Sequence, residues 1–431
     1  MRLCRLFRTS VLLAFLALSL ASCGDDGGAD PEGADVLRSS KARITMSTAT
    51  PLDIEEVGAG NRAFAFDLYR ELRTEDGNLF LSPHSISTAL AMTYAGAEGD
   101  TETQMRDALH FVDETRLHPT MNAIDLALGD RGQAARGSDE GPFRLNVINA
   151  TWGQRGYPFL PSYLDVLGEH YGAAMYLLDF GNDPEGSRAI INGWVEDQTE
   201  DRIRELIPMG LITPITTLVL TNAIYFNAAW NQPFEVSDTR DGDFHRLDAS
   251  VVSVPMMFQD EEHRYGEGDG FRAVELEYDA PELSMVLVLP DDGRFEEIDA
   301  SIDDAMYTSI MGSLSQHRVE VTLPKFSYES ALRLNGPLKA LGMTDAFDGG
   351  LADFSGMDGT RSLFIQAVLH QAFVDVNEAG TEAAAATAVI IGRVSIPELA
   401  EITFDRPFLY FIVDKPTGEL LFLGRVVDPG A

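Results

Sequence analysis

The chain has 431 residues, enough for two or three average domains or for one large α/β domain, and its 45% hydrophobic content suits an extensive core. Its 32 lysines and arginines stand against 68 aspartates and glutamates, which gives a formal net charge of −36. Phosphate backbones and anionic membrane surfaces repel so acidic a protein, and the composition therefore argues against a nucleic-acid partner.

The N-terminus has the pattern of a secretory signal. Three arginines precede the apolar run from residue 11 to residue 20, which is too short for a comfortable membrane-spanning helix. The sequence Leu-Ala-Ser-Cys at residues 20–23 resembles the bacterial lipoprotein signal, in which the cysteine is lipidated and becomes the mature N-terminus. We therefore expect a signal peptide over residues 1–22 and a lipid anchor on Cys23; an ordinary cleavable signal with an incidental cysteine is the alternative. The first interpretation predicts export across the inner membrane and attachment to the cell envelope or cell surface.

The only two cysteines are Cys4 and Cys23, so the folded body contains no thiol. This excludes disulfides, thiolate nucleophiles and cysteine-based metal sites there. Residues 23–55 are rich in Gly, Asp, Ser and Thr and lack apolar periodicity, which predicts a flexible tether before a domain at 56–431.

Helices are predicted early in this domain. Phe64, Leu68 and Leu72 recur at helical spacing, and Ser82 followed by Pro83 supplies the cap and first turn of a second helix. A third helix is predicted to begin with a capping box made by residues 101 and 104.

The remainder mixes long strands with a few helices, without regular strand–helix alternation, and this predicts an α+β fold. Helices are expected near residues 185–199, 302 and 338. Strands are expected at residues 143–152, 218–226, 251–258, 271–278, 283–289 and 319–323.

The segment from Val374 to Pro397 combines conflicting local signals. The alanines at 383–386 favour a helix, whereas residues 387–391 favour a strand. If the segment were a strand, every second residue from Thr381 to Ile391 would lie on one uncharged face, which could be buried. A short Ala-rich surface helix is the alternative.

Motifs of enzymes and cofactor sites are not found. The eight histidines show no metal-binding spacing, and the sequence contains no G-x-S-x-G, Walker or G-x-G-x-x-G motif. We therefore predict a protein without catalytic residues, metal or cofactor.

Several ordered motifs, which together span roughly residues 57–429, resemble the serpin family of protease inhibitors. They are NLFLSPHSIS at 78–87, TNAIYF at 221–226, LPKF at 323–326, FDRPFLYFIV at 404–413 and LFLGRVVDP at 421–429. The resemblance implies a single α+β domain with three β-sheets, eight or nine helices and an exposed C-terminal reactive-centre loop, which enters the main sheet after cleavage.

The resemblance also assigns residues. It implies a polar shutter beneath the centre of the main sheet, formed by Ser82, Ser85, Asn222 and His370. It implies a breach at the top of that sheet, with Trp230 and Lys325. Ordinary core polar residues and an ordinary core tryptophan are the alternatives.

The hinge of the loop is implied at Glu378, Ala379, Gly380, Thr381, Glu382, Ala383, Ala384, Ala385 and Ala386. Glu378 is expected to form an ion pair with Lys325. At position 379 the chain has alanine, where inhibitory members usually have a second glutamate. The small residues that follow favour insertion, because bulky or charged groups would stall a strand sliding between two others.

The family register places the cleaved bond between Val394 and Ser395, which suits an elastase-like protease; a one-residue shift to Arg393 and Val394 would suit a trypsin-like one. Gly380 to Val394 is fourteen steps, about 45 Å when extended at ~3.3 Å per residue. The resemblance thus implies a monomeric inhibitor that carries an acylated serine protease to the far end of its sheet. The alternative is a non-inhibitory member that acts as a binding or chaperone-like protein.

Overall fold

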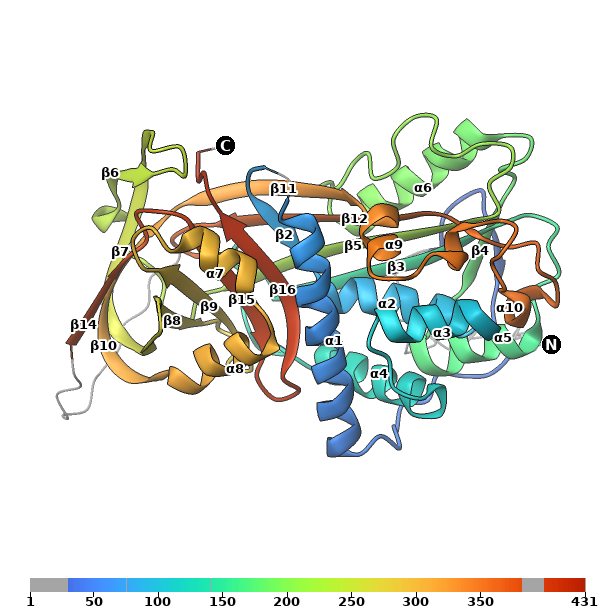
Figure 1. The fold of residues 1–431 in the computed structure, drawn as a ribbon, viewed down its shortest axis with the longest axis horizontal. Helices are drawn as coiled ribbons and strands as arrows, with labels where there is room; N and C mark the ends of the chain where they lie inside the picture. Colours follow the sequence, from blue (N-terminus) through green and yellow to red (C-terminus); the bar gives the residue numbers. More distant parts are fainter. Residues whose placement is uncertain (1–29, 75, 140, 382–398, 431) are drawn as a thin grey trace, which may run out of the picture.

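A computed structural model of the chain describes residues 30–74, 76–139, 141–381 and 399–430. These residues contain ten α-helices, two short 3-10 helices and one π-helical turn (Figure 1). The helices are α1 (Pro51–Leu72), α2 (Pro83–Tyr94), α3 (Gly99–Ala108), α4 (Glu114–Gly129), α5 (Pro161–Val166), η1 (Leu167–Tyr171), α6 (Pro184–Gln198), η2 (Val236–Asp238), α7 (Phe295–Ser301), α8 (Asp304–Ser313), α9 (Asn335–Ala340), η3 (Asp345–Phe347) and α10 (Ser355–Asp358).

The same residues form sixteen strands. They are β1 (Asp35–Leu37), β2 (Leu79–Leu81), β3 (Arg144–Gln154), β4 (Met175–Leu178), β5 (Leu218–Ala229), β6 (Arg240–His245), β7 (Val251–Gly268), β8 (Phe271–Glu277), β9 (Leu283–Pro290), β10 (Ser315–Pro324), β11 (Phe326–Arg333), β12 (Ile365–Val376), β13 (Gly380–Thr381), β14 (Leu399–Thr403), β15 (Phe408–Asp414) and β16 (Glu419–Val426). The predicted α+β class is confirmed.

The main sheet has the order β1-β4-β3-β5-β13-β12-β11, and its long strands cross the molecule in Figure 1. Every residue of β5 is buried, because helices lie over both faces of the sheet. Ile191 and Val195 of α6 pack with Val219 on one face, whereas residues of α1 and α2 belong to the core that contains Leu220 and Ile224. Burial on both faces explains why the sequence of β5 is nearly continuous in apolar residues.

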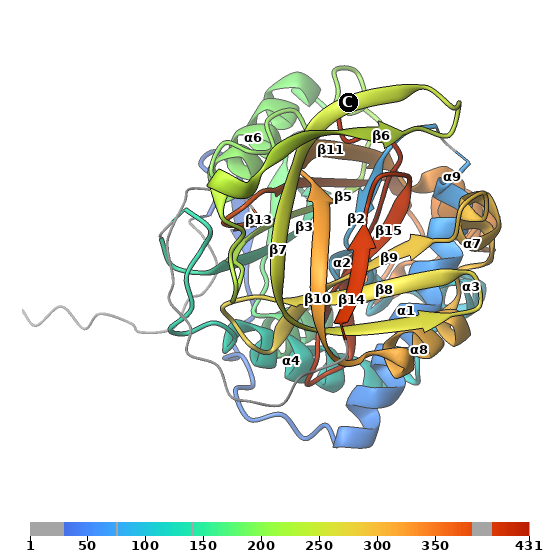
Figure 2. The ribbon, with the colours of Figure 1, turned by 90° about the vertical axis from the view of Figure 1, so that its left-hand side faces the viewer.

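The second sheet has the order β14-β10-β7-β8-β9-β15-β16-β2, and β6 pairs with β7 (Figure 2). The eighteen-residue β7 joins its two parts. Its first residues pair with β6, its middle with β10 and its end with β8. The second and third sheets that the sequence resemblance implied are therefore two parts of one hydrogen-bonded sheet.

The N-terminal segment corrects the predicted tether. Instead of a flexible tether through residue 55, residues 35–37 form β1, which pairs antiparallel with β4 and extends the main sheet. Basic side chains of this segment also bind the body: the Lys41 Nζ lies 3.1 Å from a carboxylate oxygen of Glu169, and the Arg43 Nε donates to Asn122 Oδ1 at 3.1 Å. Helix α1 begins at Pro51, after a capping box between Thr50 and Asp53.

Helix starts were predicted with mixed success. Ser82 caps α2 as expected, because its Oγ accepts the Ser85 backbone N–H. The capping box expected at residues 101 and 104 is wrong, since α3 begins at Gly99. Thr101 Oγ1 and Gln104 Oε1 instead accept backbone N–H groups of the segment at 344–353. Residue 302 lies between α7 and α8 rather than inside one helix.

Candidate functional site

The two-residue strand β13 lies between β5 and β12 in the main sheet. Gly380 pairs with Ala229 of β5, and Thr381 pairs with both Ala228 of β5 and Val376 of β12. Both pairings are antiparallel. The chain thus enters the sheet at one end of these two strands, immediately before the residues that the structure leaves undescribed.

Glycine is required at position 380 because the backbones approach closely. A Cβ atom there would lie 2.1 Å from the Ala228 carbonyl oxygen and 2.8 Å from the Ala229 Cα. Both contacts are with backbone, which cannot move aside without breaking the pairing. Gly380 therefore allows the backbone of β13 to pack closely against β5.

A tight turn at residues 377–380 presents β13 to the sheet. The Asn377 backbone N–H donates to the Gly380 carbonyl, and its side-chain Oδ1 accepts the Ala379 N–H at 3.1 Å. Ala379 is only 6% exposed, and its carbonyl accepts the Trp230 backbone N–H. The alanine at position 379, where inhibitory members usually have glutamate, is thus a small side chain in a buried position.

Trp230 and Tyr278 form the support beneath this turn. Their rings stack with centroids 4.7 Å apart, and the Trp230 Nε1–H donates to the Asn377 carbonyl at 3.0 Å. The Tyr278 hydroxyl lies 2.8 Å from Thr381 Oγ1. Burial raises the pKa of Tyr278 far above its ordinary value, so this hydroxyl stays protonated and able to donate.

The expected ion pair between Glu378 and Lys325 is present. Glu378 Oε2 lies 2.8 Å from Lys325 Nζ, and the Thr239 hydroxyl donates to Glu378 Oε1 at 2.8 Å. Burial alone would raise the pKa of Glu378, but the lysine and the hydroxyl hold it below its ordinary value. The carboxylate is therefore charged at neutral pH and fixes the base of the segment that follows.

Beyond β13, strands β5 and β12 pair directly and in parallel, from Leu218 and Ile365 to Ile224 and Ala372. In this register Asn222 lies opposite His370. The four residues that the resemblance grouped as the shutter lie together here, at the start of α2 and on these two strands. They are joined by hydrogen bonds from His370 to Asn222, from Asn222 to Ser85 and from the Ser82 backbone to His370.

The hydrogen bonds define the protonation of His370. The Ser82 N–H can only donate, so His370 Nε2 accepts it at 3.1 Å, and Nδ1–H donates to Asn222 Oδ1. Burial lowers the pKa of His370 to about 3, which keeps the ring neutral. The imidazole thus has both nitrogens satisfied, and its bond to Asn222 crosses from β12 to β5.

Two further residues take part that the sequence did not indicate, one in the shutter and one beside β13. Asn149 of β3 accepts from Asn222 and from Ser85, and Tyr278 supports Thr381. An asparagine inside the strand predicted at residues 143–152 was the available signal for Asn149. The candidate reactive residues Arg393, Val394 and Ser395, the hinge residues Glu382 to Ala386 and the candidate lipidation site Cys23 lie outside the described residues.

Residues 59–429 match the family model described as serpin (serine protease inhibitor). The chain belongs to the serpin family. An uncharacterised serpin-like protein of Thermococcus kodakarensis is 40% identical over 371 residues, which cover 85% of this chain and 84% of the relative. The leukocyte elastase inhibitor of Bos taurus is 38% identical over 387 residues, covering 87% and 100%.

A solved serpin structure has the same fold. The thermophilic serpin tengpin, in its native state, superposes with a TM-score of 0.79 at 26% identity, covering 92% of this chain and 99% of tengpin. Ten helices are described here, where eight or nine were expected for a serpin, and this count includes α10 with four residues. Within the described ranges, no helix meets the length and apolarity needed to cross a bilayer, and no cluster of three potential metal ligands occurs.

Proposed function

We propose that this serpin inhibits serine proteases as a suicide substrate, by inserting its cleaved loop into the main sheet. The observation that carries the proposal is the position of β13. Gly380 and Thr381 are already hydrogen-bonded between β5 and β12, at the end where a longer strand would enter. Insertion then requires extension of an existing strand rather than formation of a new one.

Continuing the register of β13 supports this. Gly380 faces Ala229 and Thr381 faces Ala228, so a fully inserted loop would bring Ile391 opposite Leu218, the first residue of β5. The inserted strand would then match the whole of β5. Val394 follows three residues later, just past the end of the sheet.

The alternation of side chains in the loop also suits burial of one face against the core. Thr381 contacts Tyr278 in the core, so the alternate residues 383, 385, 387, 389 and 391 would face the same core. None of them is charged. Glu382 would lie on the opposite face.

Pairing supplies a driving force. Between Leu218 and Ile224 the sheet now has one parallel ladder between β5 and β12. An antiparallel strand between them would replace it with two antiparallel ladders, which have more main-chain hydrogen bonds and slightly better geometry. The native state is then a kinetic trap, whose lifetime depends on the barrier to separating β5 from β12.

The hydrogen bond between Asn222 and His370 opposes this separation. An inserted strand must pass between the two side chains. In the continued register, Thr387 would face both of them, and its hydroxyl can bond to either group. The network would thereby exchange one internal bond for new ones instead of leaving buried groups unsatisfied.

We propose the following trapping step. The serine Oγ of the protease attacks the Val394 carbonyl carbon, the bond to the Ser395 nitrogen breaks, and that nitrogen takes the proton. The acyl-enzyme ester remains on the new C-terminus. Insertion then carries the protease to the far end of the sheet and distorts its active site before water hydrolyses the ester.

The small aliphatic side chain of Val394 favours an elastase-like target, and the similarity to a leukocyte elastase inhibitor agrees with this. A trypsin-like target would cut after Arg393. Incubation with each protease, followed by a denaturing gel and mass spectrometry of the released peptide, tests both points. An SDS-stable complex and a peptide that begins at Ser395 are expected with elastase; simple clipping by a fully active protease would contradict inhibition.

A non-inhibitory role as a binding or chaperone-like protein is the second candidate. The feature that favours it is Ala379, at a position where inhibitory members usually have glutamate. In that case the loop would be cut as an ordinary substrate, and cleavage would not stabilise the fold.

We also propose that Cys23 carries lipid and holds the monomeric inhibitor at the cell envelope or cell surface. Detergent partitioning of the exported protein tests this. The native sequence is expected in the detergent phase and Cys23→Ala in the aqueous phase, whereas equal partitioning of both would argue for an ordinary signal peptide.

A further inference from the structure

Residues 136–138, in the segment between α4 and β3, form a clasp beside β13. The Ser138 hydroxyl donates to the Thr381 carbonyl oxygen at 3.0 Å. Ser138 and Thr381 are each 2% exposed, so their hydrogen bond is shielded from water. The bond therefore joins the hinge to a part of the chain that lies outside β5 and β12.

Asn227 of β5 orients Ser138. Its Oδ1 accepts the Ser138 backbone N–H at 2.7 Å and lies 3.3 Å from the Ser138 hydroxyl oxygen. A hydroxyl has one proton to donate, and the Thr381 carbonyl is the nearer acceptor. Because Asn227 is fully buried on a strand that flanks the entry point, it directs the Ser138 hydroxyl toward the hinge.

Two glycines permit these contacts. A Cβ atom at Gly137 would lie 2.5 Å from Asn227 Oδ1, and a Cβ atom at Gly380 would lie 2.9 Å from the Ser138 Cβ. A larger residue at either position would push Ser138 away from β5 or from the hinge. Gly380 therefore fits the clasp as well as strand β5.

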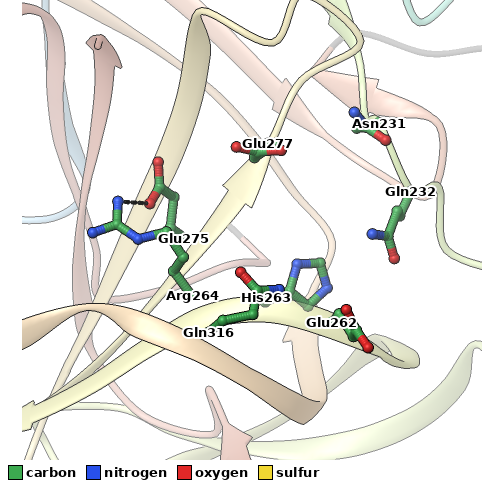
Figure 3. A pocket seen from close by; sticks show the side chains of 8 residues that line it. All are labelled: Asn231, Gln232, Glu262, His263, Arg264, Glu275, Glu277 and Gln316. Atoms are coloured by element: carbon green, nitrogen blue, oxygen red, sulfur yellow. Dashed lines mark hydrogen bonds and ion pairs between the residues drawn. The ribbon is translucent and has the colours of Figure 1, made fainter. Parts of the chain in front are cut away.

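The other end of the clasp is anchored where the main sheet meets the second sheet. The Arg136 carbonyl accepts the Ala229 N–H at 3.0 Å, and the Arg136 guanidinium donates twice to the Asp279 carboxylate, at 3.1 and 3.2 Å. The Asp279 N–H in turn donates to the Ala229 carbonyl at 2.8 Å. Asn231 and Glu277, which bond across the same junction at 2.9 Å, line a small polar cavity there (Figure 3). The clasp thus rests on a part of the molecule that is held from several sides.

Strand β13 has few contacts of its own. Its two residues form three pairs, which must offset the conformational entropy lost when the chain is ordered. The hydrogen bond from Ser138 adds to these pairs. Insertion extends the strand after Thr381, so this bond does not have to break when the loop enters.

We propose that Ser138 is a positioning residue for loop insertion. The clasp holds the Thr381 carbonyl between β5 and β12 before cleavage, so the inserting strand extends from a fixed register. This role rests on the proposed inhibition by insertion, whereas the contact between the clasp and the hinge exists in the intact protein.

Hydrogen exchange of the intact protein tests the contact. Ser138→Ala removes only the hydroxyl, and the amides of Gly380 and Thr381 are expected to exchange about three- to tenfold faster, the fold-change typical of losing one buried hydrogen bond. Exchange in β16 should not change, which separates local opening from a general loss of stability. Asp139→Asn is the matched control: it removes the ion pair with Arg144 from the neighbouring residue and should leave exchange at the hinge unchanged.

Incubation with elastase gives the second readout. Ser138→Ala is expected to raise the share of serpin that is cleaved without forming an SDS-stable complex by at least about twofold, because a displaced hinge inserts more slowly. The rate of loop cleavage should stay the same. If the parent protein forms no complex, the proposed inhibition fails, and exchange alone decides whether Ser138 positions the hinge. The proposal is overturned if the hinge amides exchange alike in Ser138→Ala and Asp139→Asn, or if the parent traps protease and Ser138→Ala traps it equally well.

Discussion

The junction between β5 and β12 has two ends that are built in opposite ways. At the hinge end, Gly380 and Thr381 already separate the strands, and a stacked tryptophan and tyrosine support them. At the paired end, Leu218 to Ile224 contact β12 directly, and the bond between Asn222 and His370 closes the pair.

The hinge end uses small residues and close backbone contacts, whereas the paired end uses a satisfied polar network. A satisfied network holds its strands firmly but can exchange partners, since every group in it can bond elsewhere. Under the proposed mechanism, the hinge end is prepared for entry of the loop, and the paired end stays closed until the entering strand separates β5 from β12. Changes at the two ends should therefore have different consequences.

The largest effect is expected for Thr381→Arg at the hinge end. Thr381 is already 2% exposed between β5 and β12, so an arginine there would either bury an unpaired charge, at a cost of several kcal/mol, or displace β13 from the entry point. We expect the yield of SDS-stable protease complex to fall at least tenfold while cleavage of the loop continues. Thr381→Ser, which keeps the hydroxyl that faces Tyr278, is the control and should form complex normally. Equal yields from the two variants would contradict the role of the hinge end.

At the paired end, Asn222→Ala should lower the free energy of unfolding of the intact protein by about 2–4 kcal/mol. The substitution leaves the His370 Nδ1–H and the side chains of Ser85 and Asn149 short of a partner. Urea unfolding of the intact protein measures this.

Thr387→Val tests the inserted state in the same way. It should leave the stability of the intact protein unchanged and lower only the stability of the cleaved form. A loss of intact stability in Thr387→Val would contradict the proposed register.

A smaller effect is expected when the ion pair at the base of the hinge is removed. Lys325→Met should cost about 1 kcal/mol, because Lys325 is partly exposed and water screens the pair. Folding lowers the pKa of Glu378, so the pair stabilises the protein above the ordinary carboxyl pKa of 4.5 and the contribution is lost as the pH falls below it. The difference in stability between Lys325→Met and the parent should therefore shrink between pH 6 and pH 3. A difference that is constant over this range would show that the ion pair is not its cause.

The smallest effect is expected away from the junction, in the segment between β1 and α1, where Arg43 contacts α4. Arg43→Ala removes a hydrogen bond to Asn122 and an ion pair to Asp125, both partly exposed, and should cost about 0.5–1 kcal/mol. Thermal unfolding measures this cost. The yield of protease complex should not change, because β5 and β12 are untouched; a reduced yield would mean that this N-terminal segment and the junction are coupled.

Local features could be predicted from the residues themselves, whereas the hinge, shutter and breach residues came from the family resemblance. Ser82 before Pro83 marks a helix start by its own chemistry. The pairing of Glu378 with Lys325 came from the family motif, because the two lie 53 residues apart in the chain.

Features that depend on distant partners were not predictable in this way. Residues 35–37 become a strand only because β4 offers an unpaired edge, and nothing in their polar surroundings indicates this. Thr101 and Gln104 have the spacing of a capping box, yet they bind the backbone of a segment some 240 residues later. Asn149 completes the polar network because β3 runs beside β5 in one specific register.

Under the proposed mechanism, cleavage of the loop converts a kinetically trapped native fold into a more stable one. Thermal unfolding of the intact protein and of the protein cleaved between Ile391 and Ile396 compares the two states directly. We expect the cleaved protein to melt at least ~20 °C higher, since a new strand replaces one parallel ladder of the main sheet with two antiparallel ones. Equal melting temperatures would contradict insertion, and with it the proposed inhibition.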